Sequence, residues 1–133
     1  MTRRCLHIGI RTRAEGKRAL RAAFARVRHG DLTPQAPGLY FETVEDLRRI
    51  LTDKRLDLLL EVARSQPQSV RALADQLGRD YKNVNADITI LRQLGLVELE
   101  ERGGRGGPKT PTVPYDEIRV TIALRPEEAV QAA

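Results

Sequence analysis

The sequence is poor in the side chains that most often carry chemistry: it has no tryptophan, one cysteine and two histidines among 133 residues. A single cysteine cannot form an internal disulfide. Cys5, His7 and His29 also lack the spacing of a metal site. We therefore expect no metal and no cofactor, and we expect Cys5 to be a small packed side chain. No nucleophile and base can be paired, so an enzyme is the reading we favour least.

Long apolar runs are absent as well. No run approaches the roughly 20 residues that span a bilayer, and the apolar stretch after Arg4 is too short for a secretion signal. Aromatic residues are 4% of the chain, so the core must be mostly aliphatic. We expect a cytoplasmic, nucleoid-associated protein with no membrane partner.

Negative charge is scarce at the N-terminal end. Residues 1–38 contain nine Lys or Arg and two Asp or Glu, whereas residues 39–102 contain ten and twelve. The formal net charge of +5 favours a polyanionic partner. A nucleic-acid site in the middle of the chain must then rely on a few well-placed cations. The N-terminal cations could equally be a solvated helix face.

The first third of the chain predicts two short strands and two helices. The strands are residues 5–10 and 39–42, and residues 30–38 form a linker. Thr12 and Glu15 have the spacing of a capping box for a helix that ends near Arg28. A second helix follows the cap at Thr43. The first helix has one apolar stripe, made of Leu20, Ala23, Phe24 and Val27.

The middle of the chain predicts three more helices. Thr52, Ser69 and Asp80 are the expected N-caps, and Gly78 and Gly95 the expected stops. The expected buried faces are Leu56, Leu59, Leu60 and Ala63 in the first helix, Val70, Leu73, Ala74 and Leu77 in the second, and Val84, Ile88 and Leu91 in the third.

Two strands follow, beginning at Leu96 and at Tyr115, on either side of a glycine-rich loop at 102–110. Three helices, a tight turn before the third and a strand pair are the order of a winged helix-turn-helix domain. We expect an α+β fold with a three-helix core and a two-stranded wing. The expected domains are an N-terminal strand-helix extension and linker at 1–42, the winged helix at 43–125 and a tail at 126–133.

The helix at 80–94 is the expected DNA-reading element. Its polar face can enter the major groove, where asparagine pairs with adenine and arginine with guanine. Its N-terminal end suits phosphate contacts. The alternative is an ordinary solvated face. The residues expected to contact DNA from this helix and the turn before it are Arg79, Tyr81, Lys82, Asn83, Asn85, Thr89 and Arg92. Asp87, beside the buried stripe, is expected to pair with an arginine of the wing or of a neighbouring helix.

The glycine-rich loop is the expected wing, with Arg102, Arg105 and Lys109 as its DNA contacts. Arginine at the tip of a thin hairpin suits a narrow minor groove. A phosphate-binding loop of the nucleotide-hydrolase type is a poor fit, because Pro108 precedes Lys109 and no helix follows. A flexible turn without a ligand is the other alternative.

Residues 41–122 resemble a prokaryotic family of small transcriptional regulators related to the MarR and ArsR types. The likeness lies in "FETVEDLRRILTDKRLDLL", "PQSVRALADQLGRDYKNV", "LRQLGLVELEE" and "VPYDEIRVTI". "LHIGI" and the helix after it are similar to the family's leader. The resemblance implies sequence-specific binding to double-stranded DNA as a homodimer, with Tyr81, Lys82, Asn83 and Asn85 opening the recognition helix and Arg105 on the wing.

Two functions remain open. The first is a repressor that binds its operator as a two-fold dimer, with the N-terminal strand and the Leu20/Phe24 helix as the candidate dimer contact. The second is an antitoxin that binds and neutralises a small toxin and represses their shared operon, as some members of the resembled family do.

Overall fold

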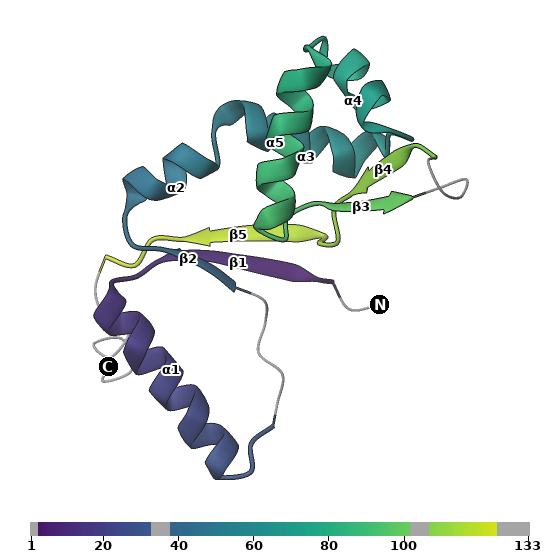
Figure 1. The fold of residues 1–133 in the computed structure, drawn as a ribbon. Helices are drawn as coiled ribbons and strands as arrows, with labels where there is room; N and C mark the ends of the chain where they lie inside the picture. The colour runs from purple at the N-terminus through teal and green to yellow at the C-terminus, as the bar shows by residue number, and fades with distance from the viewer. Residues whose placement is uncertain (1–2, 33–37, 102–106, 125–133) are drawn as a thin grey trace. The chain divides into compact units, whose positions relative to one another are not determined.

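The computed structural model describes residues 3–32, 38–101 and 107–124 (Figure 1). The chain forms an α+β protein with a three-stranded and a two-stranded sheet. Its elements are β1 (Cys5–Ile10), α1 (Arg13–Arg28), β2 (Gly38–Phe41), α2 (Val44–Ile50), α3 (Asp53–Ser65), α4 (Val70–Leu77), α5 (Tyr81–Gln93), β3 (Glu98–Glu101), β4 (Lys109–Thr112) and β5 (Glu117–Thr121).

The chain divides into two compact units. Unit 1 comprises residues 1–48 and 117–133, and unit 2 comprises residues 49–116. These limits differ from the expected domains at 1–42 and 43–125, because β5 pairs with β1 and so joins the N-terminal elements. The expected tail at 126–133 lies outside the described residues.

Unit 1 contains a parallel sheet in the order β2-β1-β5. The strands expected at 5–10 and 39–42 are confirmed, but β1 is the central strand and both of its edges are occupied. Leu6 and Ile8 point to the same side of β1 and are buried. Pairing of β1 with a second copy of the chain is therefore excluded.

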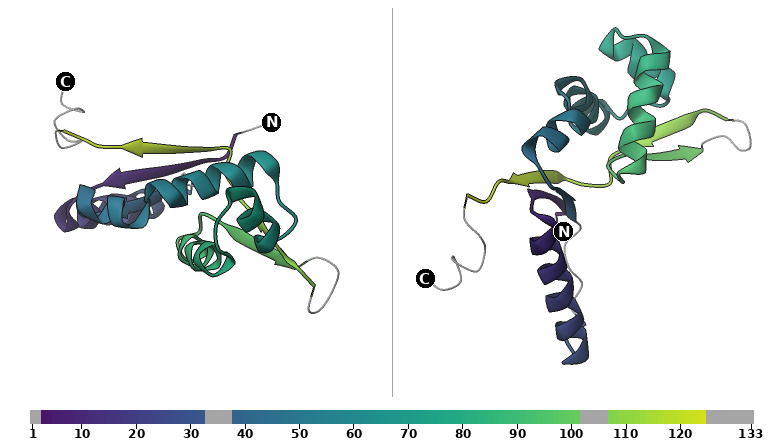
Figure 2. Two further views of the ribbon diagram at one scale, coloured as in Figure 1. Left: turned by 90° about the horizontal axis from the view of Figure 1, so that it is seen from above. Right: turned by 60° about the vertical axis from the view of Figure 1, so that its left-hand side comes forward.

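Helix α1 begins at the predicted capping box, in which the Glu15 amide donates to the Thr12 hydroxyl at 3.1 Å. Its apolar stripe is nevertheless uncovered: Leu20, Phe24 and Val27 are 58%, 60% and 55% exposed. No residue of α1 is buried. Figure 2 shows why, since the far end of α1 extends away from the strands of unit 1.

Unit 2 contains α3, α4, α5 and the antiparallel pair β3–β4. Strand β4 lies in "KTPT", a stretch expected to belong to the loop and the run after it, whereas residues 115–124 were expected to supply the second strand of the wing. That expectation was wrong. The apolar alternation of β5 indicates a strand but does not say which strand it pairs with, and Pro111 is tolerated because β4 lies at an edge of its sheet.

The core of unit 2 is aliphatic, as expected, but one predicted face is shifted. In α3 the buried residues are Leu58, Leu59 and Val62, while Leu56 and Leu60 are exposed. Leucines 58 to 60 are consecutive, so several stripes fit the helical period, and packing against α4, α5 and β4 selects one of them.

Candidate nucleic-acid interface

Helix α5 is held by one fully buried side. Val84, Ile88 and Leu91 are each 0% exposed, as the spacing predicted, and α5 packs against α4 and α3. Each such side chain contributes roughly 1.5–3 kcal/mol on burial. The opposite side is open, and the exposed residues of α5 are Tyr81, Lys82, Asn83, Asn85, Ala86, Thr89, Arg92 and Gln93.

The turn between α4 and α5 is residues 78–80. Gly78 has a φ of +64°, a left-handed conformation that ends α4. The Gly78 amide donates to the Asp75 carbonyl at 3.2 Å, and the Arg79 amide donates to the Ala74 carbonyl at 3.0 Å. This pair of bonds is a Schellman motif, which ends α4, and α5 begins after the three residues of the turn.

Asp80 occupies the N-cap position of α5, but its side chain makes no capping hydrogen bond. The predicted N-cap position of Asp80 is confirmed, but the capping bond is absent, whereas the predicted caps at Thr43, Thr52 and Ser69 all receive the expected amide. The first-turn amides of α5 thus lack the carboxylate partner that an N-cap aspartate usually supplies.

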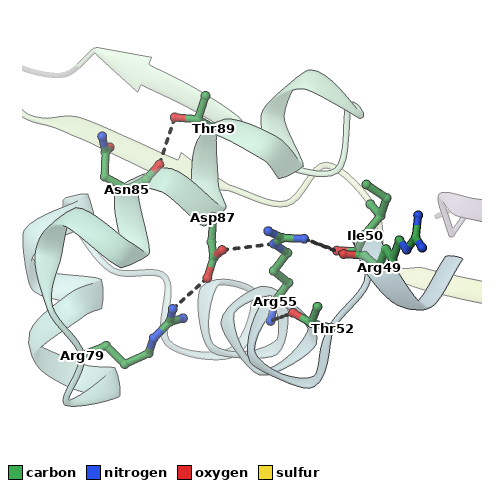
Figure 3. A network of polar contacts seen from close by, with 8 residues as sticks. All are labelled: Arg49, Ile50, Thr52, Arg55, Arg79, Asn85, Asp87 and Thr89. Atoms are coloured by element: carbon green, nitrogen blue, oxygen red, sulfur yellow. Dashed lines mark hydrogen bonds and ion pairs between the residues drawn. The ribbon is translucent and has the colours of Figure 1, made fainter. Parts of the chain in front are cut away.

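Asp87 joins three segments of unit 2 (Figure 3). Arg55 of α3 donates from Nε to Asp87 Oδ1 at 3.1 Å, and Arg79 of the turn donates from Nη2 to Oδ2 at 2.8 Å. The predicted ion pair with an arginine of a neighbouring helix is confirmed. Asp87 side-chain exposure is 14%, so water screens these pairs little.

Arg55 extends the same network to the end of α2. Its Nη1 donates to the carbonyls of Arg49 and Ile50 at 3.0 and 2.9 Å. These carbonyls belong to the last two residues of α2, where carbonyls are short of helical partners. One carboxylate and two guanidinium groups therefore connect the end of α2, the start of α3, the turn and the middle of α5.

Arg79 does not belong to the exposed face. Its side chain is 20% exposed and engaged by Asp87, and its Nη1 is buried with no hydrogen-bond partner among the described residues. The residue was expected to contact DNA, but the structure brings it to the interior side of α5. Its role here is to hold the turn.

Tyr81 and Thr89 are exposed but already engaged. The guanidinium carbon of Arg71, in α4, lies 4.7 Å from the centroid of the Tyr81 ring. The Thr89 hydroxyl donates to the Asn85 carbonyl at 2.9 Å, so its one donor is used within α5. The Asn85 side chain points away from α5 (Figure 3).

The β3–β4 hairpin is anchored to the helices by Thr110. This buried hydroxyl donates to the Gln68 carbonyl at 2.7 Å, just before the cap of α4. Lys109, at the start of β4, is exposed. The other two expected wing contacts, Arg102 and Arg105, lie outside the described residues.

The arrangement has little excess charge. Helix α5 carries two cations, Lys82 and Arg92, and its one acid, Asp87, is neutralised internally. Arg71 and Lys109 add two exposed cations on neighbouring elements. Such a surface can contact a few phosphates while presenting amide and guanidinium groups to base edges.

Two kinds of candidate are missing from the part of the chain that the structure describes. It contains no group of three or more His, Cys, Asp or Glu side chains placed to hold a metal ion. None of its helices combines the length and apolar character needed to cross a bilayer.

Residues 50–120 match the HVO_A0114 family, and this stretch is more than half of the chain. The chain belongs to the HVO_A0114 family. No curated protein and no solved structure matches the sequence. The matched region covers every element of unit 2 and most of β5, so α5, its turn and the hairpin lie within the match.

Sequence reasoning missed Arg71 and Arg55. Both are charged residues on amphipathic helices, where cations are ordinary. Arg71 contacts a residue ten positions later, and Arg55 contacts one thirty-two positions later. Neither separation has a local pattern, although the isolated Asp87 beside a buried stripe did signal that a cationic partner was needed.

Proposed function

We propose that this protein is a sequence-specific DNA-binding transcription regulator with a winged helix-turn-helix unit. In this proposal α3, α4 and α5 are the three-helix core, residues 78–80 are the turn and the β3–β4 hairpin is the wing. The observation that carries it is the contrast across α5, whose three apolar anchors are fully buried while its polar side is open. Such a helix is fixed in orientation and free to enter the major groove.

The exposed side chains of α5 suit base readout. Asn85 offers a donor and an acceptor that match the adenine edge, and Arg92 matches guanine. Thr89 is exposed, and its methyl group suits contact with the methyl group of thymine. Lys82 and the stacked pair Arg71 and Tyr81 lie at the N-terminal ends of α5 and α4, where contacts to phosphate are favoured.

The hairpin is proposed to contact the flanking minor groove or its phosphates. Lys109 starts β4 and is exposed, and Thr110 ties the hairpin to the residue before the α4 cap. A wing anchored in this way keeps its spacing from α5. Arg102 and Arg105, next to Lys109 in the sequence, are proposed to extend the contact.

A single helix of this length reads few base pairs. We therefore propose a two-fold homodimer that binds two half-sites about 34 Å apart, or a multiple of that, and acts as a repressor at the nucleoid in the cytoplasm. The test is recovery of DNA fragments bound to the protein across its genome. An enriched operator with two half-sites would support the proposal, and recovery proportional to fragment length alone would refute it.

Replacement of Asn85 with alanine tests the base readout. We expect a loss of about 1–3 kcal/mol in binding free energy on the operator and almost none on random duplex, because only the operator presents the matching base. Fluorescence anisotropy at one fixed salt concentration measures both. Equal losses on the two DNAs would show that Asn85 reads no base.

Replacement of Lys109 with alanine tests the wing. We expect weaker binding to both DNAs and a salt dependence shallower by about one unit of slope, because one phosphate contact is lost. Lys54→Ala is the matched control, since Lys54 is an exposed lysine on α3. An unchanged slope for the Lys109 variant would remove the hairpin from the interface.

One observation favours a second candidate function. The uncovered stripe of Leu20, Phe24 and Val27 on α1 is of the kind that marks a protein-binding surface. An antitoxin that binds a small toxin and represses their operon would use α1 for the toxin. Co-purification with the product of an adjacent co-transcribed gene, lost in Phe24→Asp, would select this function, and its absence would leave the free-standing repressor.

A further inference from the structure

Strand β5 ends the parallel sheet of unit 1. The order is β2-β1-β5, and among the described residues β5 pairs with β1 alone. The Glu117 amide donates to the Arg4 carbonyl beside β1 at 3.3 Å. Because backbone groups alternate along a strand, Ile118 and Val120 point their N–H and C=O groups to the other edge.

Within the described residues, the protection of this edge against pairing is limited to one acid and one base, Glu117 and Arg119. Strand β5, "EIRVT", contains no proline, lysine or bulge. Val120, and Ile122 just after the strand, are each 52% exposed. An unpaired strand with exposed apolar side chains is a template for another strand.

The charges of β5 indicate which kind of strand would pair with its open edge. Glu117 and Arg119 lie on the same face, and Arg119 Nε lies 2.8 Å from Glu117 Oε1 within the chain. In an antiparallel two-fold pair centred on Ile118, each Glu117 faces Arg119 of the other copy. These would be non-hydrogen-bonded pairs, in which Cα atoms are only about 4.5 Å apart. The strand is thus complementary to itself.

We propose that β5 pairs with β5 of a second copy, antiparallel about a two-fold axis at Ile118, to make one continuous six-stranded sheet. In this register Ile118 exchanges both of its outward hydrogen bonds with the Ile118 of the second copy. Centring the pair on Arg119 instead would place two arginines face to face, which is unfavourable.

Helix α1 fits a second copy less well than β5 does. Lys17, Arg21 and Arg28 fall along one flank of its apolar stripe, at about 100° of rotation per residue. An antiparallel two-fold pair of α1 helices would bring these like-charged flanks to the same side of the contact. The dimer contact expected at the N-terminal strand and α1 is therefore moved to β5, which leaves α1 available for a different protein.

The pairing deepens the dimer of the proposed function, yet it is independent of whether DNA is bound. A strand pair of five residues is a small interface, so we expect a micromolar dimer in free solution. Two linked half-sites on DNA would raise the local concentration and hold it together.

Sedimentation equilibrium of the full chain without DNA, from about 5 to 500 µM, tests the pairing. We expect a reversible monomer–dimer equilibrium in which Glu117→Arg and Arg119→Glu each weaken the dimer at least tenfold. A one-to-one mixture of the two variants should restore it as a heterodimer. Each variant has lost the Glu117–Arg119 pair within its own chain, so recovery in the mixture reports on the contact between chains.

Lys17→Glu supplies the control, because it lowers the net charge of the chain as Arg119→Glu does and lies on α1. It leaves β5 native, so it should dimerise like the native chain by itself, and in a mixture with Glu117→Arg only the Lys17→Glu chains should dimerise. The proposal would be overturned by a native chain that stays monomeric throughout. It would also be overturned if Glu117→Arg or Arg119→Glu alone dimerised like the native chain, or if the mixture of these two variants stayed monomeric. Operator affinity is measured on the same samples, so loss of DNA binding by itself is recognised as failure of the proposed function only.

Discussion

Helices α1 and α5 have similar sequence patterns, but their apolar stripes differ in burial. Each has an apolar stripe at helical spacing and a cationic or polar flank. In α5 the stripe is fully buried, whereas in α1 the three large apolar side chains are more than half exposed. The difference arises because α4 and α3 cover α5, while α1 has no buried residue. Amphipathic spacing therefore predicts a helix and the face it needs to cover, but not whether the same chain covers it.

The largest expected effect comes from comparing a buried residue of α5 with an exposed residue of α1. Ile88→Ala, at a fully buried site of α5, should lower the free energy of unfolding by about 2–5 kcal/mol, because the cavity is only partly refilled. Leu20→Ala, on the exposed stripe of α1, should change it by less than about 0.5 kcal/mol. Urea denaturation followed by circular dichroism measures both. Similar losses for the two variants would mean that the α1 stripe is covered in the monomer.

A smaller loss is expected from Asp87→Ala, at about 2–3 kcal/mol in the same assay. The variant leaves the guanidinium groups of Arg55 and Arg79 partly buried without their counter-charge. Since Asp87 also sets the position of α5 against α3 and the turn, operator affinity should fall more than affinity for random DNA. A stable variant with unchanged operator affinity would show that the network is dispensable.

The smallest effect separates two helix caps. Ser69→Ala should cost about 1 kcal/mol, because the Ser69 hydroxyl accepts the Ala72 amide at 3.0 Å. Asp80→Ala should cost only a few tenths of a kcal/mol, since its side chain makes no capping bond and acts on α5 through charge alone. Thermal unfolding of the two variants ranks them, and an equal loss would imply that Asp80 caps α5 in solution.

Much of unit 2 could be predicted from local signals. The stops at Gly78 and Gly95, the caps at Thr52 and Ser69 and the anchors of α5 all follow from residue types within one or two turns. Pairings between distant segments could not be predicted in this way. The alternation of β5 is equally compatible with β3 and with β1, and the choice depends on a partner more than a hundred residues earlier.

The residues of the candidate interface could likewise be predicted only where the helical period indicates their direction. The exposed side of α5 follows from its helical period, and the structure places Tyr81, Lys82, Asn83, Asn85, Thr89 and Arg92 there. The direction of the Arg79 side chain could not be predicted, because one residue in a turn has no period to indicate it. Its engagement by Asp87 depends on how α5 and the turn meet, which only the packed structure specifies.

The late position of β5 in the chain bears on how the protein is made. Unit 2 is one uninterrupted stretch, so it can fold as soon as residue 116 has left the ribosome. The sheet of unit 1 must wait for its third strand, which arrives after every residue of unit 2. During that interval β1 presents an open edge, and a nascent chain stalled or truncated before residue 117 would carry a complete helical unit beside an unfinished, aggregation-prone sheet.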